Sequence, residues 1–132
     1  MHNVFRSLVL GAAATLFLAG CQQKPHKPQP PVAAQLDQLS ALLAGGHFLR
    51  QNCARADIPD DVKLQRTAMR IAQQRGWNTQ AVEYRQLPAR TQERYQALQQ
   101  DSTLMSEKCA ALNRSTARFI AAAQSDQVDW ME

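Results

Sequence analysis

Three cysteines are the residues of this chain with the most distinctive chemistry, and they stand in different contexts. Cys21 follows an apolar run, Leu8 to Leu18, and two small residues, whereas Cys53 and Cys109 lie in polar sequence of helical character. A cysteine thiolate can act as a nucleophile, pair in a disulfide or bind a metal. The surroundings of each cysteine therefore decide which of these reactions it serves.

Residues 1–20 have the pattern of a secretory signal. One cation, Arg6, precedes the apolar run, and Ala19 and Gly20 provide the small residues of a cleavage site. The run is shorter than the roughly 20 apolar residues of an ordinary transmembrane helix, although a retained anchor is the alternative. The four residues Leu18-Ala19-Gly20-Cys21 resemble a lipobox. That resemblance implies a diacylglyceryl group on the Cys21 thiol, cleavage before Cys21 and acylation of its amine.

Gln22 follows Cys21 in place of the aspartate that commonly retains bacterial lipoproteins in the inner membrane. The resemblance thus implies sorting to the outer membrane, with the domain on the periplasmic face. Two or more acyl chains anchor a protein stably, whereas one chain binds only marginally. We expect this covalent lipid and no further cofactor.

Cys53 and Cys109 are the two cysteines that remain once Cys21 is assigned to lipid. An export signal places them in an oxidising compartment, where such a pair usually forms a disulfide. A metal site would need further ligands, and His47 is the single histidine near either cysteine in the sequence. The sequence therefore predicts a Cys53–Cys109 disulfide and no metal.

The charge of the chain is mild and dispersed. The formal net charge is +4, of which Arg6 in the signal contributes one unit, and the other arginines are interleaved with glutamines and acids. A nucleic-acid-binding surface would need a dense basic stripe with aromatic residues between. We therefore expect solvated helix faces and no nucleic-acid partner.

The mature chain divides into a tether, residues 21–34, and one domain, residues 35–132. Pro25, Pro28, Pro30 and Pro31 make the tether extended and unable to order itself by burial. At ~3 Å per residue it could hold the domain up to roughly 40 Å from the membrane.

Helical spacing of apolar residues runs through the domain, without strand-like alternation of useful length. A first helix ends near Asn52, with Gly45 and Gly46 weakening its middle. Asp60 or Asp61 caps a second helix that ends at Gly76. Residues 78–86 are ambiguous, either a short helix or a loop, and Trp77 is expected in the core.

Pro88 suits the first turn of a third helix, and the spacing from Met105 to Ala123 predicts a fourth, continuous helix. Short connections favour antiparallel neighbours. The expected fold is therefore all-α, a small four-helix bundle. An up-down-up-down path places Cys53 and Cys109 at the same end of the bundle, which makes their disulfide geometrically sensible.

Motifs of catalysis are missing: the sequence has no phosphate-binding loop, no GxSxG elbow and no CxxC pair. We therefore predict a binding protein rather than an enzyme. The first helix is richer in apolar residues than one narrow seam needs, so part of it could line a groove for a short amphipathic helix. Burial of the whole set in the bundle is the equal alternative. Together with one residue of the fourth helix, the predicted groove is Leu36, Leu39, Leu42, Leu43, Phe48 and Ile120.

The mature chain resembles the pilotin lipoproteins of type II secretion, the PulS/OutS family, and it is closest to OutS-type members. The resemblance is carried by several short segments, which occur in one order over nearly all of the mature chain. They are Gln35-Leu36-Asp37-Gln38-Leu39-Ser40, Asn52-Cys53 leading to Ile58-Pro59, Gln74-Arg75-Gly76-Trp77, Tyr95-Gln96-Ala97-Leu98-Gln99-Gln100-Asp101-Ser102-Thr103 and Lys108-Cys109.

The resemblance implies a four-helix fold with one disulfide and a role in protein transport. A pilotin binds the C-terminal segment of a secretin subunit, which becomes helical in the groove, protects the subunit from proteolysis, and uses the lipoprotein-sorting machinery to bring it to the outer membrane for ring assembly. We expect a monomeric domain. The alternatives are a scaffolding outer-membrane lipoprotein without a secretin client, and an envelope hydrolase or hydrolase inhibitor.

Overall fold

The computed structural model describes residues 28–129, with side chains through Asp126, and this part of the chain is helical without strands. The elements are α1 (Val32–Asn52), α2 (Asp61–Gln74), the 3-10 helix η2 (Val82–Gln86), α3 (Leu87–Gln100), α4 (Met105–Ser115) and α5 (Ala117–Asp129). The all-α prediction is confirmed. The predicted signal, Cys21 and most of the tether lie outside the described residues.

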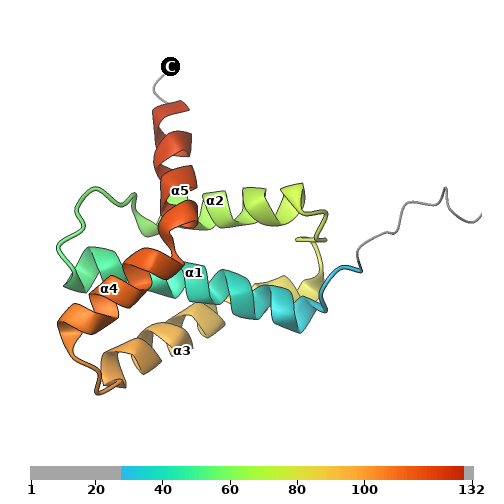
Figure 1. The fold of residues 1–132 in the computed structure, drawn as a ribbon. Coiled ribbons are helices and arrows are strands. Elements are labelled where there is room, and N and C mark those ends of the chain that lie inside the picture. Colours follow the sequence, from blue (N-terminus) through green and yellow to red (C-terminus); the bar gives the residue numbers. More distant parts are fainter. Residues whose placement is uncertain (1–27, 130–132) are drawn as a thin grey trace, which may run out of the picture.

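Helix α1 is the centre of the domain, and α2, α3 and α4 all contact it (Figure 1). It begins at Val32 rather than near Gln35, with Pro31 at the N-cap. Because neighbours surround it, α1 buries residues on several sides instead of along one stripe, as expected of a core helix. Its buried residues are Gln35, Leu36, Leu39, Ser40, Leu43, Ala44, Gly45, Gly46, Phe48 and Leu49.

The direction of the helices follows the predicted up-down-up-down path from α1 to α4 (Figure 1). Asp37 near the start of α1 pairs with Arg90 early in α3 at 3.1 Å, and His47 later in α1 contacts Tyr95 later in α3. The two helices therefore run in the same direction, with α2 and α4 opposed to them.

The ends of α2 form as predicted. The carboxylate of Asp60, the N-cap residue, accepts a hydrogen bond from the Lys63 backbone N–H at 2.9 Å. Gly76 has φ +81°, a conformation that glycine adopts without steric cost. Trp77 then turns into the core and is 6 % exposed.

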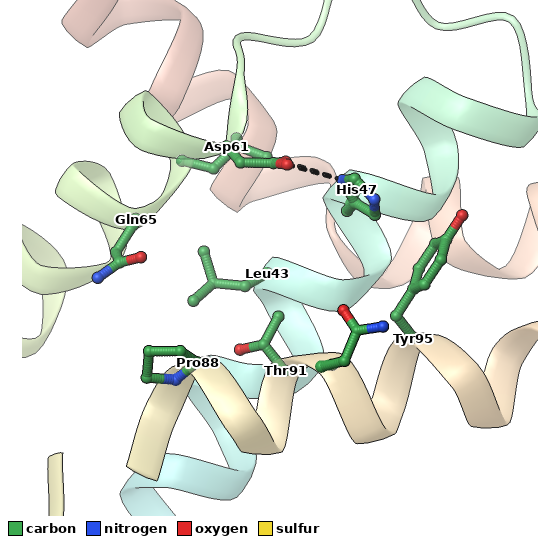
Figure 2. A pocket seen from close by; sticks show the side chains of 9 residues that line it. Leu43, His47, Asp61, Gln65, Pro88, Thr91 and Tyr95 are labelled. Carbon is green, nitrogen blue, oxygen red and sulfur yellow. Dashed lines mark hydrogen bonds and ion pairs between the residues drawn. The ribbon is translucent and has the colours of Figure 1, made fainter. Parts of the chain in front are cut away.

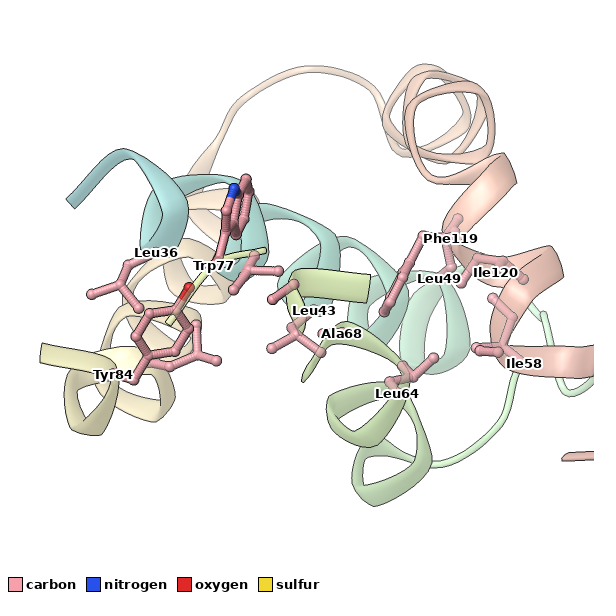
Figure 3. Packing of buried hydrophobic residues seen from close by; sticks show 14 residues of the cluster. Leu36, Leu43, Leu49, Ile58, Leu64, Ala68, Trp77, Tyr84, Phe119 and Ile120 are labelled. Carbon is pink, nitrogen blue, oxygen red and sulfur yellow. The ribbon is translucent and has the colours of Figure 1, made fainter. Parts of the chain in front are cut away.

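The ambiguous segment 78–86 contains η2, which holds Tyr84 in the core. The Tyr84 hydroxyl donates to Gln35 Oε1, and Gln35 Nε2 donates to the Pro30 carbonyl at 2.9 Å. This buried polar link joins η2 to the beginning of α1. In Figure 3, Tyr84, Trp77 and Leu36 form one end of the core.

The prediction of one continuous fourth helix was wrong. The helix breaks at Thr116 (φ −107°, ψ 5°), and α5 leaves α4 at a steep angle and packs on α2 (Figure 1). Thr116 Oγ1 donates to the Leu112 carbonyl at 2.7 Å, a side-chain bond that competes with regular helix geometry. The break allows Phe119 and Ile120 to reach the core near Leu49 and Ile58 (Figure 3).

The disulfide between Cys53 and Cys109 is confirmed, with the two Cα atoms 5.7 Å apart. It joins the end of α1 to α4 at the end of the bundle where the path predicted that they meet. Beside it, the Lys108 ammonium donates to the Leu98 carbonyl of α3 at 2.7 Å and lies 5.7 Å from the Phe48 ring centroid. Helices α1, α3 and α4 are thus fastened together at this end.

Gly45 and Gly46 let the neighbours of α1 approach it closely. A Cβ at Gly45 would lie 2.9 Å from Thr116 Cγ2, and one at Gly46 would lie 2.9 Å from Leu64 Cδ1. Both distances are too short for carbon atoms in contact. The glycine pair is therefore a packing feature.

Gly45→Ala should destabilise the domain, although alanine is the better helix former by about 1 kcal/mol. The added methyl overpacks the contact with Thr116 at a cost of about 1–3 kcal/mol, which leaves a net loss on the order of 1 kcal/mol. Urea unfolding measures it. Thr116→Ser removes the clashing methyl and keeps the hydroxyl, so Gly45→Ala should become neutral or stabilising in that background. An equal loss in both backgrounds would refute the packing explanation.

Candidate binding cleft

A cleft of about 270 Å³ lies between α1, α2 and α3 (Figure 2). Leu43 and Leu64 form its apolar floor, at 7 % and 0 % exposed, and polar side chains of α2 and α3 surround it. Its lining residues are Leu43 and His47 from α1, Asp61, Leu64 and Gln65 from α2, and Pro88, Thr91, Gln92 and Tyr95 from α3. A concave surface with apolar side chains and a few placed polar groups is the ordinary form of a binding site.

The predicted groove residues belong largely to the core of the domain. Leu36, Leu39 and Phe48 are completely buried, Leu43 is 7 % and Ile120 3 % exposed, and Leu42 is half-buried. Of the six, Leu43 also lines the cleft between α1, α2 and α3. In this conformation the leucine-rich face of α1 therefore packs mainly against its own neighbours.

Sequence reasoning missed the walls that α2 and α3 provide. Gln65 and Gln92 have the character of solvent-facing residues, and both are exposed. The spacing of Pro88, Thr91 and Tyr95 could have indicated the α3 wall of the cleft, because it places these residues on one face of a helix. Thr91 Oγ1 is buried without a hydrogen-bond partner in the structure.

One edge of the cleft is polar and is built around His47. Its Nδ1 lies 3.0 Å and 2.9 Å from the two carboxylate oxygens of Asp61. The imidazole also meets the Tyr95 ring edge to face, with 4.5 Å between centroids. Arg50 Nη1 lies 3.6 Å from Asp61, and Asn52 Nδ2 donates to the Tyr95 hydroxyl at 3.3 Å.

A second cleft of about 270 Å³ lies on the α4 side of the contact between α1 and α3. Its floor is built mostly of small residues, and Arg94 and Asp101 flank it. The lining residues are Ala41, Ala44, Arg94, Ala97, Leu98, Asp101, Leu112 and Ser115. The first cleft differs in offering an aromatic ring and an imidazole, groups that give large contact area at low entropic cost.

Within residues 28–129 we find no group of three or more histidine, cysteine or acidic side chains placed to hold a metal ion. None of the helices in this part of the chain combines the length and apolar character needed to cross a membrane.

The loop between α1 and α2 is held by charged contacts. Asp57 accepts two hydrogen bonds from the Arg55 guanidinium at 2.8 Å and one from Gln124 Nε2 of α5 at 2.9 Å. The Arg55 hydrogen bonds are the main cause that lowers the pKa of Asp57 to about 2. The charged carboxylate thus ties this loop to α5.

Because folding lowers its pKa, Asp57 stabilises the domain above about pH 4, and that contribution is lost as the pH falls toward 2. The side chain is 53 % exposed, so its contribution is below about 1 kcal/mol. Asp57→Asn should be less stable than the parent at pH 5, and the difference should shrink steadily as the pH falls through 2. Urea unfolding across this range measures the difference, with Glu93→Gln as the control; a difference that does not vary with pH would contradict the assignment.

The fold is a small helical domain with a concave surface of the kind that serves as a binding site. The chain belongs to the family of type II secretion system pilotin lipoproteins (PulS_OutS), whose family model matches residues 18–121. The resemblance found from the sequence is thereby confirmed.

Two curated relatives support the assignment. The pullulanase secretion protein PulS of Klebsiella pneumoniae is 40% identical over 110 residues, which cover 81% of this chain and 86% of that protein. The pilotin OutS of Dickeya dadantii (strain 3937) is 35% identical over 130 residues, covering 92% and 96%. The likeness therefore spans nearly the whole length of each relative.

Solved structures agree with the fold. A pilotin in a pilotin/secretin peptide complex matches with a TM-score of 0.68 and 36% identity, covering 72% of this chain and 98% of that one. A chain of the Klebsiella pneumoniae type II secretion system outer membrane complex, which contains PulD, PulS and the PulC HR domain, matches with a TM-score of 0.63 and 38% identity, covering 68% and 95%.

Proposed function

We propose that this chain is a pilotin that binds the C-terminal segment of a type II secretin subunit and delivers the subunit to the outer membrane. Its function is binding and delivery, not catalysis. The observation that carries the proposal is the likeness, over 98% of the neighbour's length, to a structure of a pilotin/secretin peptide complex. The alternative, a scaffolding lipoprotein without a secretin client, has no such observation in its favour.

We place the secretin segment in the cleft between α1, α2 and α3. A short amphipathic helix can place apolar side chains over the floor formed by Leu43 and the buried Leu64, while Gln65 and Gln92 bind polar groups at its flanks. A segment that is disordered when free must give up conformational entropy on binding. A preformed cleft lowers the other costs of association, because its own side chains are already placed.

Binding of the segment would also protect the secretin subunit from proteolysis. Proteases cleave extended, accessible chain, and a helix held against the cleft is neither. A monomeric domain that uses the cleft between α1, α2 and α3 would bind one segment.

Lipid on Cys21 directs the protein to its membrane. Support comes from the lipobox residues Leu18 to Cys21 and from the family match, which begins at residue 18 and so includes them. Acyl chains on Cys21 would allow the lipoprotein-sorting machinery to carry the chain, with its cargo, to the periplasmic face of the outer membrane. Palmitate labelling of the full chain, compared with Cys21→Ser, tests this step: label on both proteins would overturn it.

Titration with a peptide from the C-terminus of the secretin subunit tests the binding step. Far-ultraviolet circular dichroism should show more helix in the mixture than in the sum of the separate components, and calorimetry should show one peptide bound per chain. Absence of binding at roughly 100 μM peptide, where even a weak interaction of about −5 kcal/mol would register, would contradict the proposal.

A further inference from the structure

His47 contacts both of the other helices that form the cleft. From α1 its imidazole nitrogen reaches Asp61, the first residue of α2, at 2.9 Å, and its ring stacks edge to face on Tyr95 of α3 at 4.5 Å between centroids. Figure 2 shows it at the edge of the cleft, joined to Asp61 and facing Tyr95. A single side chain therefore connects three helices at one end of the site.

The contact with Asp61 has little support from other residues. Arg50 lies farther from the carboxylate, at 3.6 Å, and it too comes from α1. On the α3 side, Tyr95 is additionally held by Asn52 and lies 6.0 Å from the Phe48 ring. Tyr95 is thus held by several contacts from α1. The first turn of α2 is held to α1 by the packing of the buried Leu64 against Gly46, and its Asp61 carboxylate is held by His47 and, at a longer distance, by Arg50.

We propose that His47 is a positioning residue that sets the width of the cleft for the docked helix. This rests on the proposed function and adds to it the residue that fixes the geometry of the site. By holding Asp61, His47 keeps the first turn of α2 at a set distance from α3, so that Leu64 and Gln65 face the cleft. Preorganisation of this kind raises affinity by removing the cost of ordering the walls when the segment binds.

His47→Ala should weaken binding of the secretin C-terminal peptide by about 3- to 10-fold, the effect expected from losing one charge-assisted hydrogen bond and one aromatic contact at a half-exposed position. His47→Gln, which keeps a donor for Asp61, and His47→Phe, which keeps the ring for Tyr95, should each restore part of the affinity. Gln51→Ala, at an exposed position of α1 outside the cleft, is the control and should bind like the parent.

A double-mutant cycle separates positioning from general stability. If His47 acts through Asp61, the peptide affinities of His47→Ala, Asp61→Ala and the double variant will be non-additive, with the double variant close to the worse single variant. The melting temperature of each free variant is measured alongside. If the variants have lower melting temperatures but bind the peptide as tightly as the parent, the inference is overturned and the proposed function stands. If the parent chain itself binds no peptide, the proposed function is overturned.

Discussion

Loss of the Cys53–Cys109 disulfide should lower the free energy of unfolding by about 4 kcal/mol, the chain-entropy value for a loop of this size. The bond closes a loop with a sequence separation of 56 residues and ties the end of α1 to α4. For a domain of about 100 residues, this corresponds to a fall in melting temperature on the order of 20 °C. Such a loss is a large fraction of the stability of a small domain.

Thermal unfolding followed by circular dichroism measures this effect. The double variant Cys53→Ser/Cys109→Ser is compared with the parent, each with and without reductant. Reductant should lower the transition of the parent to near that of the double variant and leave the double variant unchanged. If full reduction lowers the melting temperature of the parent by less than about 5 °C, equivalent to about 1 kcal/mol, the stabilising role of the disulfide is contradicted.

A tryptophan in place of Gln92 should weaken binding of the secretin C-terminal peptide by about 100-fold, equivalent to about 2.7 kcal/mol. Gln92 lies on α3 and lines the cleft, so a bulky indole at this position can occupy the space that the docked helix needs. The position is exposed, and substitutions at exposed positions usually change stability by less than about 0.5 kcal/mol. The loss would therefore report on the cleft rather than on folding.

The matched control is Gln99→Trp, an exposed glutamine on the same helix that does not line this cleft. It should bind the peptide like the parent. Calorimetry on the three proteins, with melting temperatures to verify folding, makes the comparison. Equal affinity of Gln92→Trp and Gln99→Trp would place the docking site elsewhere on the domain.

Much of the fold could be predicted because its signals are local. The Asp60 cap, the Gly76 stop and the position of Pro88 each act through their own backbone, and the structure has all three where expected. The break at Thr116 could not be predicted in this way. Apolar spacing continues across it, and the bond from Thr116 Oγ1 to the Leu112 carbonyl that accompanies the break leaves no trace in that spacing.

The site was harder to predict than the fold, and the reason is physical. Leucines such as Leu36 and Leu39 satisfy core packing and groove lining equally well on pattern alone, and the structure uses them in the core. The polar walls of the cleft, Gln65 and Gln92, carry no sequence signal that distinguishes them from solvated positions. Only the packing of α2 and α3 around α1 brings them together.

The disulfide and the cleft belong to one arrangement. The disulfide fastens the C-terminal end of α1. His47 lies between one and two turns before that end, and Tyr95 of α3 contacts His47 from the opposite side. A firmly held α1 gives the cleft a fixed wall. Reduction should consequently lower peptide affinity as well as stability.

Nuclear magnetic resonance of the isotope-labelled domain, titrated with the secretin C-terminal peptide, tests the central claim most directly. Saturable shifts of backbone amides should concentrate on α2 and α3 around Gln65, Thr91 and Gln92, which line the cleft with α1. Shifts concentrated instead around Ala97, Leu112 and Ser115 would assign the peptide to the second cleft, and a spectrum unchanged by saturating peptide would contradict the proposed function.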